Sequence, residues 1–117
     1  MREGDVRTIR RSAEVSPVAL LSILSVVELE GGVPAAPEGA AIRRLKLDEL
    51  YEVVDILPFD RAEAATYRTI VTACGFSRTK IIDRMIAAQA IVAGATLATL
   101  NPRDFRNISG LHLEDWS

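Results

Sequence analysis

The spacing of hydrophobic residues in the first half of the chain predicts two short strands on either side of a helix. Val18–Leu24 is an apolar run of strand length, typical of a strand that is buried on both faces. Ala41–Val54 repeats its apolar residues at helical spacing and so predicts an amphipathic helix. Close to one face of this helix lie Ile42, Leu45, Leu47, Leu50, Tyr51 and Val54. Asp55 then opens a short strand that Pro58 closes.

The second half predicts further helices and strands in alternation. Asp60 opens a helix that Gly75 ends, and Ser77 opens another that Gly94 ends. A buried strand and an alternating edge strand follow at residues 95–101 and 110–116. Residues 5–14 predict a short charged helix, and residues 33–40 a Pro/Gly-rich loop. This order predicts an α/β fold with a mostly parallel sheet between helices.

Composition limits the classes of function. With 117 residues, 49% of them hydrophobic, we expect one domain over residues 1–117. The net charge of −2 argues against a globally basic nucleic-acid binder, and the aromatic content of 5% is too low for a base-stacking platform. Because Cys74 and His112 are the sole cysteine and histidine, Cys/His zinc sites and Cys-His dyads are not expected.

Neither a signal peptide nor a membrane span is expected. The longest apolar runs, Val18–Val27 and Met85–Leu100, are interrupted by polar residues and fall short of the roughly 20 residues that cross a bilayer. The N-terminal sequence MREGDVRTIRR is charged and has no apolar stretch directly behind it. We therefore expect a soluble cytoplasmic protein.

Two acidic residues follow the predicted buried strands. Glu28 comes after the first of these strands and Asp104 after the second, so both belong to the sheet edge where α/β proteins bind ligands. Each also has a structural explanation. Ser25 and Glu28 match an S-x-x-E capping box, while Asn101 and Asp104 match the cap and first turn of a helix.

Asp83 is harder to explain as a solvated residue, since it falls past the first turn of a helix that is apolar nearly all round. Its neighbours on the same face, Ile86, Ala87 and Ala90, are apolar. A buried carboxylate without a partner is costly, so a basic side chain or a metal ion should face it. The other acids favour the metal, because carboxylates that lie close together repel unless a divalent cation lies among them.

These stretches resemble the motifs of one family. SVVELEGGV is similar to the E-L-x-x-G segment of PIN-domain ribonucleases. KIIDRMIAAQAIVAGATLATLNPRDF is similar to their D-x-x-I-A-A helix followed by the T-x-N-x-x-D-F strand end. DILPFD and GLHLEDW match the usual joins in VapC-type toxins of bacterial toxin–antitoxin pairs. The likeness covers residues 3–116 with the motifs in the family's order, and it implies a PIN-like three-layer fold.

The resemblance implies a Mg²⁺- or Mn²⁺-dependent endoribonuclease. Its catalytic and metal-holding acids would be Glu28, Asp83 and Asp104, with Thr99 and Asn101 supporting the site. The metal would polarise the phosphodiester and lower the pKa of a bound water, which attacks phosphorus without a nucleophilic side chain. The resemblance also implies an RNA substrate, a VapB-type antitoxin as partner, and a homodimer.

The N-terminus departs from the family pattern. Family members begin with a central strand that ends in D-T or D-S and supplies a further metal-site acid, whereas MREGDVRTIRR resembles the segment after that strand. Asp5 lies in a charged stretch and does not take that role. Either the start codon is placed too late, or the chain is a truncated copy. We expect weak or no RNase activity and association through the strand edges that the missing strand would expose.

Two other functions stay open at this point. One is a catalytically inactive PIN-like module that binds an antitoxin or itself, and the other is an unrelated small α/β binding domain. An upstream in-frame strand ending in Asp-Thr would favour the active toxin. Around the acids, Lys80, Arg84 and Arg103 could hold RNA phosphates, although each also fits an ordinary solvated charge. His112 is expected to be an exposed strand residue.

Overall fold

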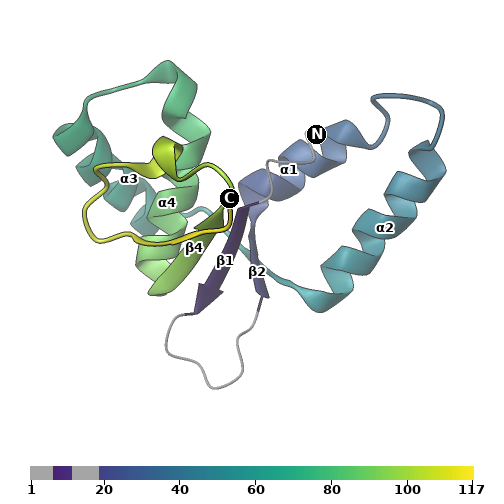
Figure 1. The fold of residues 1–117 in the computed structure, drawn as a ribbon, viewed down its shortest axis with the longest axis horizontal. Helices are drawn as coiled ribbons and strands as arrows, with labels where there is room; N and C mark the ends of the chain where they lie inside the picture. Colours follow the sequence, from purple (N-terminus) through teal and green to yellow (C-terminus); the bar gives the residue numbers. More distant parts are fainter. Residues whose placement is uncertain (1–6, 12–18) are drawn as a thin grey trace.

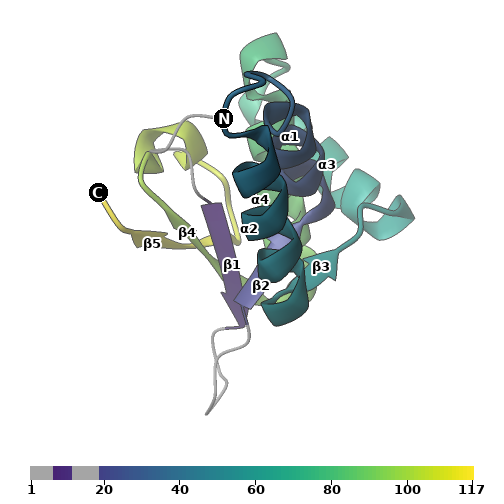
Figure 2. The same ribbon diagram turned by 90° about the vertical axis from the view of Figure 1, so that its right-hand side faces the viewer.

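A five-stranded sheet in the order β3-β2-β1-β4-β5 forms the centre of the molecule (Figure 2). The computed structural model describes residues 7–11, as backbone, and 19–117. The strands are β1 (Arg7–Arg11), β2 (Ala19–Ser22), β3 (Asp55–Leu57), β4 (Ala95–Thr99) and β5 (His112–Asp115). β2 and β3 are parallel, as are β4 and β5, while β1 runs antiparallel to β2 and β4. The predicted mostly parallel sheet is confirmed.

The central strand is the main departure from the sequence-based picture. We expected a helix over residues 5–14, but Arg7–Arg11 is a strand, in which Ile9 pairs with Leu20 of β2 and with Leu97 of β4. The rest of that predicted helix lies outside the described residues. Because β1 supplies ladder partners to both neighbours, the expectation that β2 and β4 would expose free edges is wrong.

Helices cover both faces of the sheet. They are α1 (Ile23–Gly32), α2 (Ala40–Val53), α3 (Arg61–Cys74) and α4 (Ile81–Ala93), with the 3₁₀ turns η1 (Arg78–Lys80) and η2 (Pro102–Phe105). α1 and α2 lie on one side of the strands, and α3 and α4 on the other (Figure 1). This is the expected three-layer arrangement. None of the helices in the described ranges is long and apolar enough to span a membrane.

Two of the predicted helix starts need correction. Ser22, not Ser25, caps α1, because its Oγ accepts a hydrogen bond from the Leu24 N–H at 3.0 Å. Ser25 is buried inside the helix, so the predicted capping box with Glu28 does not form. α4 begins at Ile81, after the η1 turn, rather than at Ser77. The other predicted ends hold: the capping box at Asp60 opens α3, and Gly75 and Gly94 follow α3 and α4 with φ of 82° and 62°.

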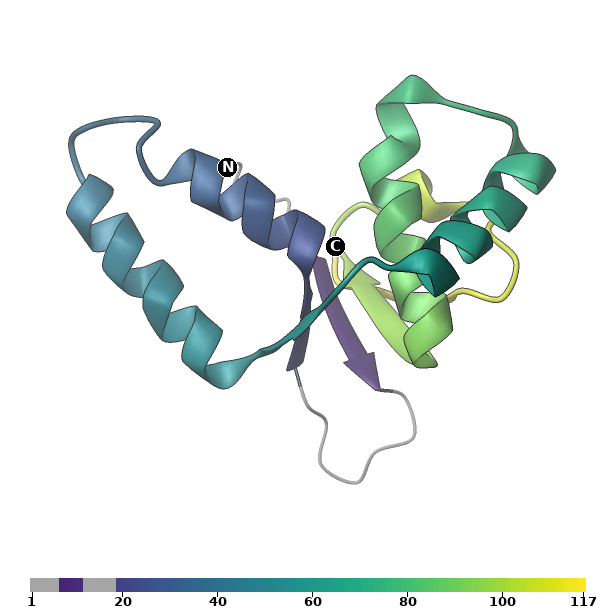
Figure 3. The same cartoon turned by 180° about the vertical axis from the view of Figure 1, so that it is seen from behind.

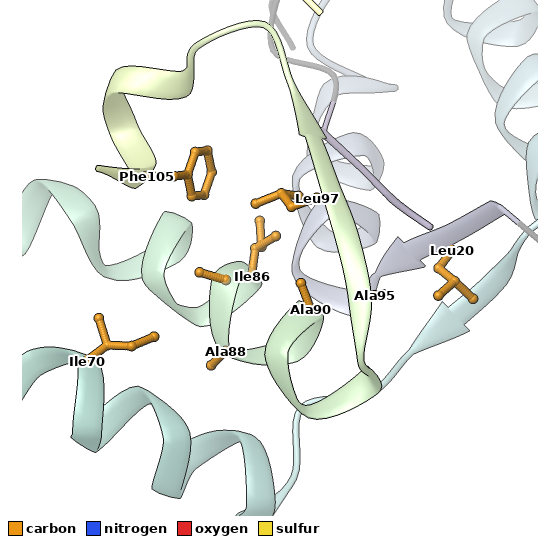
Figure 4. Close-up of a cluster of buried hydrophobic side chains, with 9 residues drawn as sticks. Leu20, Ile70, Ile86, Ala88, Ala90, Ala95, Leu97 and Phe105 are labelled. Atoms are coloured by element: carbon orange, nitrogen blue, oxygen red, sulfur yellow. The ribbon is translucent and has the colours of Figure 1, made fainter. Parts of the chain in front are cut away.

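The hydrophobic core lies between the sheet and the α3/α4 layer (Figure 4). α4 is its centre, because Ile86, Ala87, Ala88 and Ala90 have no exposed surface. The sheet and the neighbouring segments add Leu20, Ile70, Ala95, Leu97 and Phe105. The expectation that the helix holding Asp83 is largely buried is therefore confirmed.

The α1/α2 layer packs much less tightly. The two helices extend away from the sheet as a hairpin, which is visible from both sides (Figures 1 and 3). Leu47 is the one buried residue of α2 in the structure as described. Ile42, Leu45 and Val53 are 60%, 59% and 72% exposed, so α2 does not bury the single apolar face that the sequence predicted.

Candidate functional site

One edge of the sheet collects the segments that carry the predicted site residues. β2 ends at this edge with Ser22 and continues into α1, while β4 ends there with Thr99 and continues into η2. α4 runs back along the sheet and turns at Gly94 into β4, so its first turn lies near the end of β4 and packs on η2. The carboxyl ends of parallel strands are where α/β sheets place their ligands.

Three acids of this edge were predicted from the sequence to form a metal site. Asp83 lies half-buried in the first turn of α4, where the helix dipole favours a negative charge. Glu28 lies on the exposed surface of α1, and Asp104 on the exposed surface of η2. In the part of the chain that the structure describes, no group of three or more Asp, Glu, His or Cys side chains could hold a metal ion.

The expected convergence of the three carboxylates is therefore not present. α1 leaves the sheet at Ser22 and runs outward with α2, while α4 lies on the other side of the strands (Figure 1). The catalytic and metal-holding roles of Glu28, Asp83 and Asp104 stay a prediction.

Thr99 and Asn101 turn the chain at the end of β4. The Thr99 side chain is buried, and its Oγ1 accepts a hydrogen bond from the Asn101 N–H at 3.0 Å. The Asn101 carbonyl in turn accepts from the Asp104 N–H at 3.1 Å. These contacts hold the backbone that carries Asp104, which suits the supporting role expected of both residues.

The three basic residues near the acids differ in accessibility. Arg84 is buried, and its Nη1 donates a hydrogen bond to the Gly75 carbonyl at 2.5 Å. This bond ties α4 to the loop after α3. That Lys80 and Arg84 share a face and hold RNA phosphates stays a prediction. Lys80 is half-buried and Arg103 is exposed. His112 is exposed in β5, as expected.

A buried polar network at the same edge was not predicted. The Gln89 Nε2 donates to the carbonyls of Leu57 and Pro58 at 3.0 and 2.9 Å. Its Oε1 accepts from the Ser22 Oγ at 2.5 Å. One side chain of α4 is thereby joined to β2, to the cap of α1 and to the end of β3. The sequence signal was present, since Gln89 is the polar exception in an otherwise apolar stretch of α4.

A second unpredicted group joins α1 to α2. Arg44 donates to both carboxylate oxygens of Glu30, at 2.6 and 3.0 Å, and to Asp48 at 2.6 Å. The Tyr51 hydroxyl donates to Glu30 at 2.6 Å. The bond from Arg44, with that from Tyr51, lowers the pKa of Glu30 to about 2. Burial, followed by the bond to Glu30, raises the pKa of Tyr51 to about 12.

A cavity of about 520 Å³ lies between α1, the following loop and α2. Its walls are largely apolar, with Leu29, Val33, Leu47 and Leu50 among the lining residues and Arg43 at its side. Arg43 is occupied, because its Nε and Nη2 donate to the Val33 carbonyl at 3.2 and 3.0 Å. None of the predicted site residues lines this cavity.

Known proteins are similar to this chain in sequence and in structure. The chain is 35% identical to Ribonuclease VapC1 of Rickettsia felis over 104 residues, which are 86% of this chain and 74% of that protein. A crystal structure of VapBC2 from Rickettsia felis bound to a promoter DNA fragment matches 82% of this chain and 73% of the solved chain, with 30% identity and a TM-score of 0.69.

A crystal structure of DNA-bound VapBC from Salmonella typhimurium has the same fold. It matches 84% of this chain and 75% of the solved chain, with 24% identity and a TM-score of 0.72. The model of the PIN domain family matches residues 2–111, nearly the whole sequence. The chain therefore belongs to the PIN domain family.

Proposed function

We propose that this chain is a metal-dependent endoribonuclease and the toxin of a toxin–antitoxin pair. The observation that carries the proposal is its 35% identity to a VapC ribonuclease. In this proposal Glu28, Asp83 and Asp104 are the catalytic acids and hold Mg²⁺ or Mn²⁺. The segments that carry these acids, α1, α4 and η2, all begin at or near the ligand-binding edge of the sheet, which supports this assignment.

The side chains of the described residues are not arranged as a metal site in this structure. Since these include no group of three potential ligands, the proposal requires the three carboxylates to come closer together than in this structure. Thr99 and Asn101 would hold the Asp104 segment in place, and Lys80 and Arg103 would contact RNA phosphates.

The proposed partner is a VapB-type antitoxin. Support comes from two solved relatives, which are VapBC complexes bound to DNA. We further propose that the chain forms a homodimer and acts on RNA in the cytoplasm. An alternative function is a catalytically inactive module that binds the antitoxin or itself. The absence of a metal-ligand group from the described residues favours that alternative.

Thermal unfolding with divalent cations tests the metal assignment. An ion that binds the folded state alone stabilises it by RT ln(1 + [L]/Kd). We expect millimolar Mn²⁺ to raise the melting temperature of the parent protein and to raise that of Asp83→Asn much less. Asp55→Asn is the matched control, because Asp55 is exposed at the start of β3, on the opposite edge of the sheet. Equal rises in all three proteins would rule out Asp83 as a ligand.

Cleavage of a structured RNA separates the two functions. The ribonuclease proposal predicts cleavage with Mg²⁺ or Mn²⁺ that is lost with EDTA or in Asp83→Asn and is kept in Asp55→Asn. Folded protein that binds a VapB-type antitoxin without cutting RNA would instead support the inactive module. EDTA-resistant cleavage would contradict the metal-dependent chemistry.

A further inference from the structure

Trp116 lies just past β5, at the edge of the sheet that collects the candidate site segments. Its backbone N–H donates to the Thr99 carbonyl at 2.8 Å, which extends the pairing of β5 with β4 past Asp115. β5 also packs against η2, and the C-terminus and η2 lie on the same side of the molecule (Figure 2). Trp116 is therefore fixed beside the end of β4, where the chain continues into η2.

The side chain of Trp116 is both accessible and held in place. The residue is 42% exposed, although its ring is large and apolar. The indole N–H, which is the one polar group of the ring, donates to the Glu114 Oε1 at 2.8 Å. This bond restricts the rotation of the ring. An aromatic ring that is accessible and held in one orientation can offer a flat face to a ligand.

The groups around Thr99 are of the kinds that bind a nucleotide. Thr99 holds both of its neighbours, because its Oγ1 accepts from the Asn101 N–H at 3.0 Å and its carbonyl accepts from Trp116. Asn101 is exposed and carries an amide, and Arg103 is exposed and positively charged. Proteins bind unpaired RNA with such a set: an aromatic ring stacks on a base, polar side chains bond to its edges, and cations contact phosphates.

The charges of this region give a bound nucleotide a direction. Glu114 and Asp115 precede Trp116 directly, so a phosphate beside the ring is disfavoured by repulsion. Arg103 lies in η2 and is followed by the candidate acid Asp104. A base at Trp116 with its phosphate toward Arg103 would therefore belong to a nucleotide close to the candidate acids.

We propose that Trp116 stacks on one unpaired base of the RNA substrate. The inference rests on the proposed function and deepens it, because it specifies RNA that is single-stranded where it meets the end of β4. One tryptophan is too little for the multi-base platform that the composition argues against, so it holds a single base. Loss of one stacked base should weaken RNA binding about tenfold.

Fluorescence titration tests the contact directly. Trp116 is the only tryptophan, so the tryptophan fluorescence of the protein reports on this ring alone. A short oligoadenylate, added in EDTA to prevent metal-dependent cleavage, should quench it until binding saturates. An abasic oligomer of equal length keeps the phosphates but has no bases, and it should not quench. In anisotropy measurements with labelled oligoadenylate, Trp116→Phe should keep most of the affinity and Trp116→Leu should lose about tenfold, because leucine is apolar but has no ring.

Ile56→Ala is the matched control. Ile56 is 41% exposed in β3, at the opposite edge of the sheet, so its loss should leave RNA affinity unchanged. Circular dichroism confirms that each variant folds. The proposal is overturned if oligoadenylate does not quench the fluorescence, or if Trp116→Phe and Trp116→Leu bind RNA equally well. A Trp116→Leu protein that binds RNA like the parent but no longer binds a VapB-type antitoxin would make Trp116 a protein contact instead.

The same titration separates this inference from the proposed function. RNA cleavage without quenching would leave the ribonuclease standing and contradict the stacking. Quenching by RNA that is never cleaved would keep the stacking and contradict the ribonuclease.

Discussion

At the scale of single residues, the side chain of Gln89 shows how one polar group can organise an apolar interior. It is 1% exposed, yet its amide donates to two carbonyls and accepts from the Ser22 hydroxyl. Buried polar groups are costly unless they are hydrogen-bonded, and here all of these groups have partners. The network fixes α4 relative to the cap of α1, and so relates the segments that carry Asp83 and Glu28.

Replacing Gln89 should be costly even when side-chain volume is kept. Gln89→Leu leaves the buried Ser22 hydroxyl without its acceptor and the carbonyls of Leu57 and Pro58 without their side-chain donor, so we expect a loss of about 2–4 kcal/mol in the free energy of unfolding. Ser22→Ala should lose about 1–2 kcal/mol, including the cap on α1. Urea unfolding of both single variants and the double variant provides the measurement. Because the two side chains are bonded, the double variant should lose less than the sum; strict additivity would contradict the coupling.

At the scale of elements, α2 shows that a helical pattern of apolar residues predicts a helix but not which of those residues are buried. Its apolar residues were expected on one face, yet Leu47 is buried while Ile42 and Val53 point to solvent. The helix is joined to α1 mainly by polar contacts centred on Glu30 and Arg44. An exposed ion pair stabilises little. The α1/α2 hairpin is therefore attached to the rest of the molecule less firmly than α4 is.

The Glu30–Arg44 contact makes the joint between α1 and α2 sensitive to acid. The bond from Arg44 lowers the pKa of Glu30 from 4.5 to about 2. Because the folded value is depressed, the stability from this carboxylate is fully present above pH 4.5 and is lost as the pH falls toward 2. A carboxyl NMR titration should show a midpoint near 2 in the parent and a higher midpoint in Arg44→Gln. Arg68→Gln, in α3, is the control and should leave it unchanged; a midpoint near 4.5 in the parent would contradict the contact.

At the scale of the whole molecule, β1 joins the two halves of the sheet. β2 and β3 belong to one half and β4 and β5 to the other, and each half pairs with opposite sides of β1. The sheet is continuous because the central position requires only a backbone with free N–H and C=O groups on both sides. Arg7–Arg11 meets this requirement although its sequence favoured a helix.

Proline at the centre of β1 should therefore destabilise the whole sheet. Ile9 pairs with Leu20 and Leu97, and Ile9→Pro removes a ladder donor from a strand with neighbours on both sides. We expect a loss of more than about 2 kcal/mol in urea unfolding. Ile9→Val keeps the N–H and nearly the same side chain, so it should stay close to the parent. Equal stability of the two variants would show that this segment does not occupy the centre of the sheet in solution.

The sequence alone determined the features whose causes lie within a few residues. The ends of α3 follow from Asp60 and Gly75, and the turn into β4 from Gly94, because caps and left-handed glycines act through their own backbone. The motifs around Glu28, Asp83 and Asp104 also identified the family, which the match over residues 2–111 confirms.

The tertiary structure alone decided the features whose partners are distant in the chain. The strand at Arg7–Arg11 depends on β4, which begins only at Ala95, and the role of Gln89 depends on β2 and β3. Whether acids from remote segments come together is likewise decided by the tertiary structure, and the described residues hold no group of three potential metal ligands. Hydrogen bonding and packing between remote segments outweigh local preference in each case. A local sequence pattern does not show which remote segment will be the neighbour.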